Sequence, residues 1–198
     1  MLLRTALLAA LTVAAPAFAE ALVGQPAPAF TATDSNGKVH RLADFRGKTV
    51  VLEWTNSGCP FVKKHYAGNM QATQAAAAKA GVVWLTVNSG APGKQGHVDG
   101  PAANAEVKAA GAKPTAYLLD AGGALGRSYG AKTTPHLFVI DGTGKTVYAG
   151  AIDDKPTADV ADLKTANNLV LAAIGQVKAG QPVTIATSKP YGCSVKYG

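Results

Sequence analysis

The strongest constraint on the fold is a strand pattern that changes to a helix pattern and back within one short stretch of the chain. Residues 49–54 and 82–87 are largely apolar, β-branched runs of the kind found in buried strands. Between them, apolar side chains recur at helical spacing over residues 60–80, and Pro60 suits the first helical turn. The stretch therefore predicts a βαβ unit, and its first turn carries Cys59.

The rest of the chain continues this alternation of helix and strand patterns. Residues 25–36 predict an extended lead-in with a turn at Asn36 and Gly37. The sequence Asp-Gly-Thr-Gly at residues 141–144 predicts the turn of a β-hairpin. The other predicted elements are helices at residues 101–110, 123–129 and 159–178 and strands at residues 116–119, 136–140 and 145–148.

Residues 1–19 have the order of features found in a secretory signal peptide. Arg4 supplies a positive charge, residues 5–15 are apolar, and an Ala-Phe-Ala cleavage site ends at Ala19. The apolar stretch is about half of the roughly 20 residues that a membrane span needs. We therefore expect a single mature domain, residues 20–198, that is periplasmic or secreted and not stably inserted in a membrane.

The charge and the cysteine count limit the classes of function. The chain has 19 basic and 12 acidic side chains, which gives a formal net charge of +7. The lysines are scattered singly or in pairs, without arginine clusters or interleaved aromatics, so nucleic acid is not an expected partner. Two cysteines are too few for a disulfide scaffold, and each is expected to have its own role.

Cys59 is the predicted nucleophile. It stands at the predicted start of a helix, where unpaired N–H groups and the helix dipole present partial positive charge. Such a position lowers the pKa of a thiol and favours the reactive thiolate, and Lys63 and Lys64 one turn later add to the same field. His65 adds to it if it is protonated and faces the site. The alternative is an inert cysteine that serves only as a small core residue.

Cys193 lies five residues from the C-terminus, after Pro190 and Gly192, which predicts an extended tail. One interpretation is a permanent disulfide to Cys59, and closing a loop of about 130 residues would stabilise the fold by roughly 4 to 5 kcal/mol. The other is the same bond made reversibly, with Cys193 resolving an oxidised Cys59. The sequence leaves both open.

Three stretches of sequence resemble a known family. They are "WTNSGCPFVKKHY" from Trp54, "TTPHLFVIDGTGKTVYAGAID" from Thr133 and "KPYGCSVKY" from Lys189. Together with the order of elements, they resemble exported, peroxiredoxin-like redoxins (AhpC/TSA type) of the thioredoxin-fold superfamily. The resemblance covers the chain from about Val23 onward. It implies an α/β thioredoxin fold with an N-terminal β extension and an extended C-terminal tail.

The resemblance also implies a second part of the site. In that family the residue before a cis-proline lies against the active sulfur. Thr134 would then present its backbone to Cys59, and Pro135 would prevent that strand edge from pairing further.

The chain departs from the family pattern at the catalytic motif. Val62 occupies the position where a Cys-x-x-Cys site has its second cysteine. A typical peroxiredoxin has threonine three residues before its peroxidatic cysteine and proline seven before, and this chain has Asn56 and Leu52 there. Asn56, or else Thr55 or Ser57, is therefore the candidate hydrogen-bond donor to a peroxide oxygen.

No metal or other cofactor is expected. Related exported thioredoxin-fold proteins carry copper on two cysteines and a histidine, and a Cu(I) site from both cysteines and one histidine is chemically allowed here. However, the chain has no Cys-x-x-x-Cys motif and no pair of histidines at helical spacing.

The expected function is that of a thiol-dependent, peroxiredoxin-like antioxidant oxidoreductase. Cys59 would reduce hydroperoxides, Cys193 would be the resolving cysteine, and an unknown thiol would donate the electrons. The alternatives are a thiol:disulfide oxidoreductase acting on envelope proteins, or a non-catalytic binding domain with a structural Cys59–Cys193 disulfide. We expect a monomer or a weak homodimer.

Overall fold

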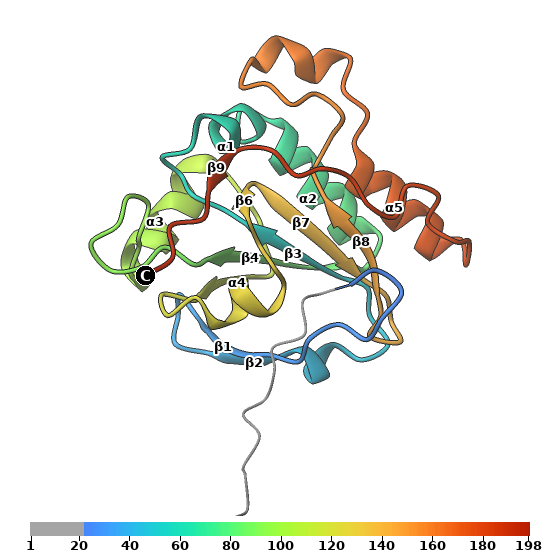
Figure 1. Cartoon of the computed structure of the whole chain (residues 1–198), viewed down its shortest axis with the longest axis horizontal. Helices are drawn as coiled ribbons and strands as arrows, with labels where there is room; N and C mark the ends of the chain where they lie inside the picture. The colour runs from blue at the N-terminus through green and yellow to red at the C-terminus, as the bar shows by residue number, and fades with distance from the viewer. Residues whose placement is uncertain (1–21) are drawn as a thin grey trace, which may run out of the picture.

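A seven-stranded sheet forms the centre of the protein in a computed structural model that describes residues 22–198 (Figure 1). The predicted signal peptide lies outside the described residues. In spatial order the strands are β2 (Val39–Arg41), β1 (Thr31–Asp34), β5 (Ala116–Leu119), β4 (Val83–Asn88), β3 (Val50–Trp54), β7 (His136–Ile140) and β8 (Thr146–Gly150). The strands β3, β4 and β5 run parallel, and the other pairs are antiparallel. The predicted thioredoxin fold with its N-terminal β extension is confirmed.

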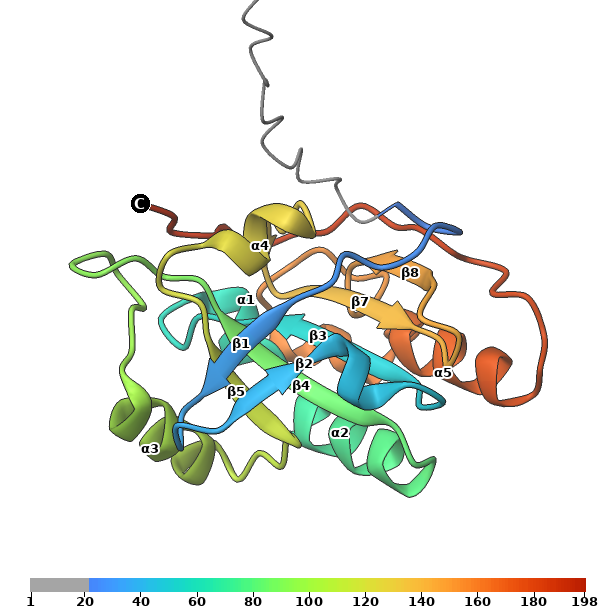
Figure 2. The same ribbon diagram turned by 90° about the horizontal axis from the view of Figure 1, so that it is seen from below.

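Helices cover both faces of this sheet (Figures 1 and 2). On one face, α2 (Asn69–Lys79) and α5 (Leu169–Lys178) pack over alternate side chains of β3, β4 and β7. The opposite face is covered by α4 (Ala124–Ser128) and the N-terminal segment around Phe30. Beside β5 lies α3 (Gly100–Ala110).

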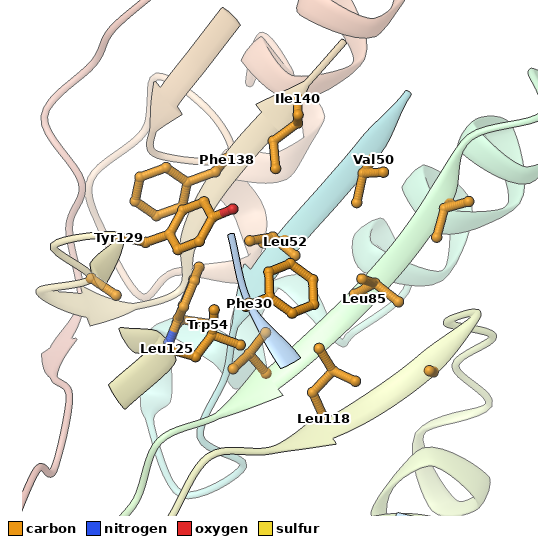
Figure 3. Packing of buried hydrophobic residues seen from close by; sticks show 14 residues of the cluster. Phe30, Val50, Leu52, Trp54, Leu85, Leu118, Leu125, Tyr129, Phe138 and Ile140 are labelled. Atoms are coloured by element: carbon orange, nitrogen blue, oxygen red, sulfur yellow. The ribbon is translucent and has the colours of Figure 1, made fainter. Parts of the chain in front are cut away.

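Aromatic side chains form the centre of the core on the α4 face (Figure 3). Trp54 is fully buried, and its ring centroid lies 5.7 Å from that of Tyr129 and 5.3 Å from that of Phe138. The indole N–H of Trp54 donates to Ser89 Oγ at 3.0 Å, which satisfies its one polar atom. The last residue of β3 is thereby fixed immediately before the loop that carries Cys59.

The helix predicted over residues 60–80 is wrong as one element. It is divided into α1 (Pro60–His65) and α2, with Gly68 between them at φ +117°. Residues with a side chain rarely adopt this backbone conformation, so Gly68 permits a change of direction that the apolar spacing does not reveal. As a result, α1 is a short separate helix whose start and end are both close to the site.

The helix predicted over residues 159–178 is also wrong in its extent. A 3₁₀ helix, Val160–Lys164, precedes α5, which begins only at Leu169. Asn168 caps α5, because its side chain accepts a hydrogen bond from Leu171 N at 2.9 Å. The 3₁₀ helix ends at Lys164, and the polar cap at Asn168, inside the apolar pattern, starts α5.

The C-terminal tail crosses the molecule from α5 towards α1 and pairs with a second strand (Figure 1). Its strand β9 (Cys193–Ser194) is antiparallel to β6 (Thr133–Thr134), in a separate two-stranded sheet. The predicted extended tail is present, and this pairing fixes where it lies. Within the described residues, no helix is long and apolar enough to cross a membrane.

Candidate active site

Cys59 is the N-cap residue of α1, directly after the carboxyl end of β3. Its backbone is extended (φ −79°, ψ 125°), and Pro60 occupies the first helical position, where a missing N–H is tolerated. The Cys59 N–H donates to Asn56 O at 2.9 Å, which closes a tight turn before the helix. The cysteine side chain is buried and only 1% exposed. The sequence prediction of Cys59 at the start of a helix is confirmed.

The side chain of Asn56 organises this turn. Its Oδ1 accepts from Gly58 N at 2.9 Å, and its amide exchanges hydrogen bonds with Gln95, at 3.0 Å and 3.2 Å. Gln95 belongs to the long loop between β4 and α3, so Asn56 joins that loop to the Cys59 turn. Of the other candidate donors, Thr55 is buried and Ser57 is exposed. The role of Asn56 towards a peroxide stays a prediction.

The Thr134–Pro135 peptide bond is cis, as the family resemblance implies. The Thr134 carbonyl accepts a hydrogen bond from the Cys59 thiol, at a distance of 3.1 Å. Residues 75 positions apart in sequence are thereby placed in contact, and β6 forms the wall of the site opposite α1.

Cys193 lies at the same place because β9 pairs with β6. Cys193 is opposite Thr134 in the strand register, and Thr134 Oγ1 donates to the Cys193 carbonyl at 3.4 Å. Both cysteines are free thiols, with Cys59 buried and Cys193 half-buried. The structure therefore brings together four of the five predicted site residues: Cys59, Thr134, Pro135 and Cys193. The fifth, Asn56, lies in the turn that precedes Cys59.

The two thiols interact, and the interaction shifts their pKa values in opposite directions. Burial opposes ionisation of Cys59, but hydrogen bonds from the Cys193 thiol, from Val62 N and from Cys193 N outweigh it, so the pKa of Cys59 is lowered. Burial, and then donation of its own proton to Cys59, raise the pKa of Cys193 to about 11. The pair therefore favours ionisation of Cys59 before Cys193.

We predict that the pKa of the Cys59 thiol lies below the ordinary cysteine value of about 8.5. In Cys193→Ser, a hydroxyl replaces the thiol as donor, and the thiolate ultraviolet absorbance should titrate with a midpoint below about 8.5. In Cys193→Ala, which has no donor there, the midpoint should be higher. This optical titration needs no reagent to reach the buried sulfur. A midpoint at or above the ordinary value in Cys193→Ser would make Cys59 an ordinary thiol.

Lys64 is not among the groups that lower the pKa of Cys59, against expectation, and the condition under which His65 would add to the positive field is not met. Both side chains are buried, on the side of α1 that faces the tail. Lys64 Nζ donates to the Lys155 carbonyl at 2.7 Å and lies 3.8 Å from Asp153 Oδ2. Burial lowers the pKa of His65 to about 4, so its ring is neutral near neutral pH. Lys63 alone of these three is exposed.

Sequence reasoning also missed a buried carboxylate in β3. Glu53 is fully buried and accepts hydrogen bonds from Tyr66 Oη and Trp84 Nε1, each at 2.7 Å. Thr86 Oγ1 at 3.1 Å and Gln74 Nε2 at 3.3 Å complete its partners. Burial raises the pKa of Glu53 despite these bonds. The only signal in the sequence is one acidic residue within an apolar strand.

Comparison with known proteins agrees with this geometry. The model of the Redoxin family matches residues 22–167. The chain belongs to the redoxin family. No curated protein is significantly similar to it. The match includes the central sheet, the Cys59 turn and the cis Thr134–Pro135 bond of this redoxin.

Solved structures extend the comparison to about nine tenths of the chain. A hypothetical protein from Sinorhizobium meliloti is 27% identical with a TM-score of 0.72, covering 89% of this chain and 95% of its own. An uncharacterised conserved protein from Geobacillus kaustophilus is 25% identical with a TM-score of 0.73, covering 90% and 93%. A candidate thiol:disulfide interchange protein DsbE from Chlorobium tepidum is 28% identical with a TM-score of 0.55, covering 77% and 98%. The fold is thus that of thiol–disulfide oxidoreductase-like redoxins.

Metal ligands are not gathered in the part of the chain that the structure describes. Within residues 22–198 there is no group of three or more His, Cys, Asp or Glu side chains that could hold a metal ion. His65, the histidine on the same helix as Cys59, has both ring nitrogens in hydrogen bonds, to Tyr191 and Asn69.

Proposed function

We propose that this redoxin reduces hydroperoxides, with Cys59 as the attacking thiolate and Cys193 as the resolving thiol. The observation that carries the proposal is the pairing of β9 with β6, which puts Cys193 opposite Thr134, the residue whose carbonyl accepts the hydrogen bond of the Cys59 thiol. A second thiol at this position replaces the second cysteine that the Cys-Pro-Phe-Val motif lacks.

The proposed cycle has two steps within the protein. The Cys59 thiolate attacks one peroxide oxygen, the O–O bond breaks, and the leaving oxygen takes a proton and departs as an alcohol or water. Cys59 is then a sulfenic acid. Cys193 attacks its sulfur, forming the Cys59–Cys193 disulfide and releasing water. Two equivalents of an external thiol reduce this disulfide and become a disulfide themselves.

The site supports this division of roles between the two cysteines. The lowered pKa of Cys59 favours its thiolate, whereas the pKa of Cys193, raised to about 11, favours the protonated thiol until Cys59 has been oxidised. Oxidation of Cys59 removes the thiolate that accepted this proton, and with it one cause of the raised pKa. Cys193 is then freer to ionise and attack.

A second candidate is disulfide exchange with protein substrates. Its support is the likeness to the Chlorobium tepidum structure, a candidate thiol:disulfide interchange protein. In this reaction Cys59 would attack a substrate disulfide, and Cys193 would then displace the substrate from the mixed disulfide. The third reading is a non-catalytic domain in which a Cys59–Cys193 disulfide only fixes the tail.

Mild peroxide should separate these possibilities. In the reduced protein we expect a disulfide that links tryptic peptides 49–63 and 179–196. Cys193→Ser should stop at a Cys59 sulfenic acid that dimedone labels, and Cys59→Ser should form neither product. If both thiols stay free at peroxide concentrations that oxidise a control peroxiredoxin, the peroxidase proposal fails. A mixed disulfide trapped on Cys193→Ser with a protein substrate would then favour disulfide exchange.

We also propose export of the mature domain from Glu20 onward, with an unidentified thiol as electron donor. The Ala-Phe-Ala sequence before Glu20 supports the site of cleavage. A compartment outside the cytosol permits disulfides, as the proposed chemistry requires.

A further inference from the structure

Four polar side chains, Lys64, His65, Asp153 and Tyr191, form a cluster between α1 and the tail. We call it the Tyr191 cluster. Lys64, His65 and Asp153 are at most 2% exposed. His65 and Lys64 belong to the helix that Cys59 begins, and Tyr191 lies two residues before Cys193. The cluster therefore joins the two segments that carry the cysteines.

Hydrogen-bond directions within the cluster are determined by Tyr191. Its hydroxyl donates its one proton to Asp153 Oδ1. It must then accept from His65 Nε2, 3.0 Å away, while His65 Nδ1 accepts from the Asn69 amide at 2.9 Å. This arrangement requires a neutral imidazole with its proton on Nε2. Each polar atom of the Tyr191 and His65 side chains has a partner.

Charge and packing also fix the Tyr191 ring. Lys64 Nζ, paired with Asp153, lies 5.6 Å from the centroid of the ring. The Phe61 ring packs edge-on against it, with 5.8 Å between centroids. Tyr191 is thus held by both its ring and its hydroxyl, and removing the hydroxyl alone leaves the ring contacts in place.

The two sides of Cys193 are anchored differently. After Cys193, Val195 N donates to Lys132 O at 3.0 Å, and Ala91 N donates to Lys196 O at 2.8 Å, so backbone bonds hold the tail. Before Cys193, the tail is joined to β8 up to Ser188, and between Ser188 and Cys193 the side-chain hydrogen bonds come from Tyr191. Tyr191 is therefore a side-chain anchor of the segment between Ser188 and Cys193.

We infer that Tyr191 is a positioning residue, whose hydroxyl, held by Asp153 and His65, keeps Cys193 within bonding reach of Cys59. The inference deepens the proposed function, on which it rests for the use of the disulfide. A thiol held in place acts at a high effective concentration, whereas the same thiol on a loosened tail acts at a lower one. The predicted consequence is a change in the equilibrium between the two thiols and their disulfide.

The test compares Tyr191→Phe with Tyr197→Phe in glutathione redox buffers. Tyr197 lies on the other side of Cys193, and its hydroxyl donates to Ala131 O at 2.8 Å, so the control also removes one tyrosine hydroxyl from the tail. Glutathione disulfide oxidises the two cysteines and is itself reduced to two glutathione molecules. We expect Tyr191→Phe to lower the equilibrium constant for disulfide formation about ten-fold, or about 30 mV in reduction potential. Tyr197→Phe should change it much less.

A second measurement separates positioning from general damage. In a Cys193→Ala background, at a pH above the titration midpoint of Cys59, Tyr191→Phe should leave the rate of Cys59 sulfenic acid formation unchanged. The thiolate is then already formed, and the side chain at position 193 gives it no donor. Equal effects of Tyr191→Phe and Tyr197→Phe on the glutathione equilibrium, or no effect of Tyr191→Phe, would overturn the inference. The glutathione experiment uses no peroxide. If the glutathione experiment gives the expected difference between Tyr191→Phe and Tyr197→Phe but the protein does not react with peroxide, the proposed peroxidase function is contradicted and the role of Tyr191 is still supported.

Discussion

Asp153→Ala is expected to lower the free energy of unfolding by about 3–5 kcal/mol, the cost of leaving one charge of a buried pair without its partner. Asp153 is 2% exposed and Lys64 is 1% exposed, so neither charge can turn to water without unfolding the segment around it. After the substitution, Lys64 Nζ keeps the Lys155 carbonyl at 2.7 Å but loses the Asp153 carboxylate with which it is paired. Tyr191 loses the acceptor of its proton.

Asp154→Ala is the matched control for this experiment. Asp154 is the next residue and also accepts two hydrogen bonds, from the backbone and side chain of Asn167, but it lies at the surface. Urea unfolding should show a much smaller loss for Asp154→Ala than for Asp153→Ala. If the two losses are equal, burial of the Lys64–Asp153 pair does not make loss of the Asp153 carboxylate more costly than loss of a surface carboxylate.

A double substitution tests the cause of the loss. Lys64→Met with Asp153→Leu removes both charges and fills the space with apolar atoms, and such replacements are often neutral or stabilising in buried pairs. The double variant should therefore be more stable than Asp153→Ala. If the double variant is no more stable, the loss comes from the shape of the site and not from an uncompensated charge.

Local patterns were sufficient to predict most of the sheet. The apolar run that ends at Trp54 gives β3, and the Asp-Gly-Thr-Gly turn lies between β7 and β8. The N-terminal turn at Asn36 and Gly37 connects β1 and β2. These features depend on neighbours in sequence, where side-chain alternation and turn chemistry act directly.

The errors about the surroundings of Cys59 arose where a contact distant in sequence decides the structure. Lys64 and His65 have the appearance of a charged helix end, but Asp153 and Tyr191, far along the chain, make their burial possible. Nothing in the local pattern shows that such partners exist. The tail likewise looks unattached in the sequence, because its partner is the edge of a two-residue strand, Thr133–Thr134.

Gly192→Ala is expected to slow formation of the Cys59–Cys193 disulfide by about a hundred-fold, since displacement of a reacting group by about 1 Å can have that effect. Gly192 has φ +134°, which residues with a side chain rarely adopt. A Cβ there would lie 2.1 Å from the Thr134 carbonyl oxygen and 2.8 Å from its carbon. Both atoms belong to the backbone of Thr134, the residue that contacts Cys59. We therefore expect the tail, and not the Thr134 backbone, to move.

Gly175→Ala is the control for this last prediction. Gly175 is an exposed position in α5 with no atom within 4 Å of an added Cβ, so alanine should be accepted and should slightly favour the helix. Disulfide formation can be followed by acid quenching at short times after peroxide is added. A Gly192→Ala protein that closes the disulfide as fast as Gly175→Ala would show that the tail reaches Cys59 by another path. The β6–β9 pairing would then be dispensable for the resolving step, because Cys193 could react without its register opposite Thr134.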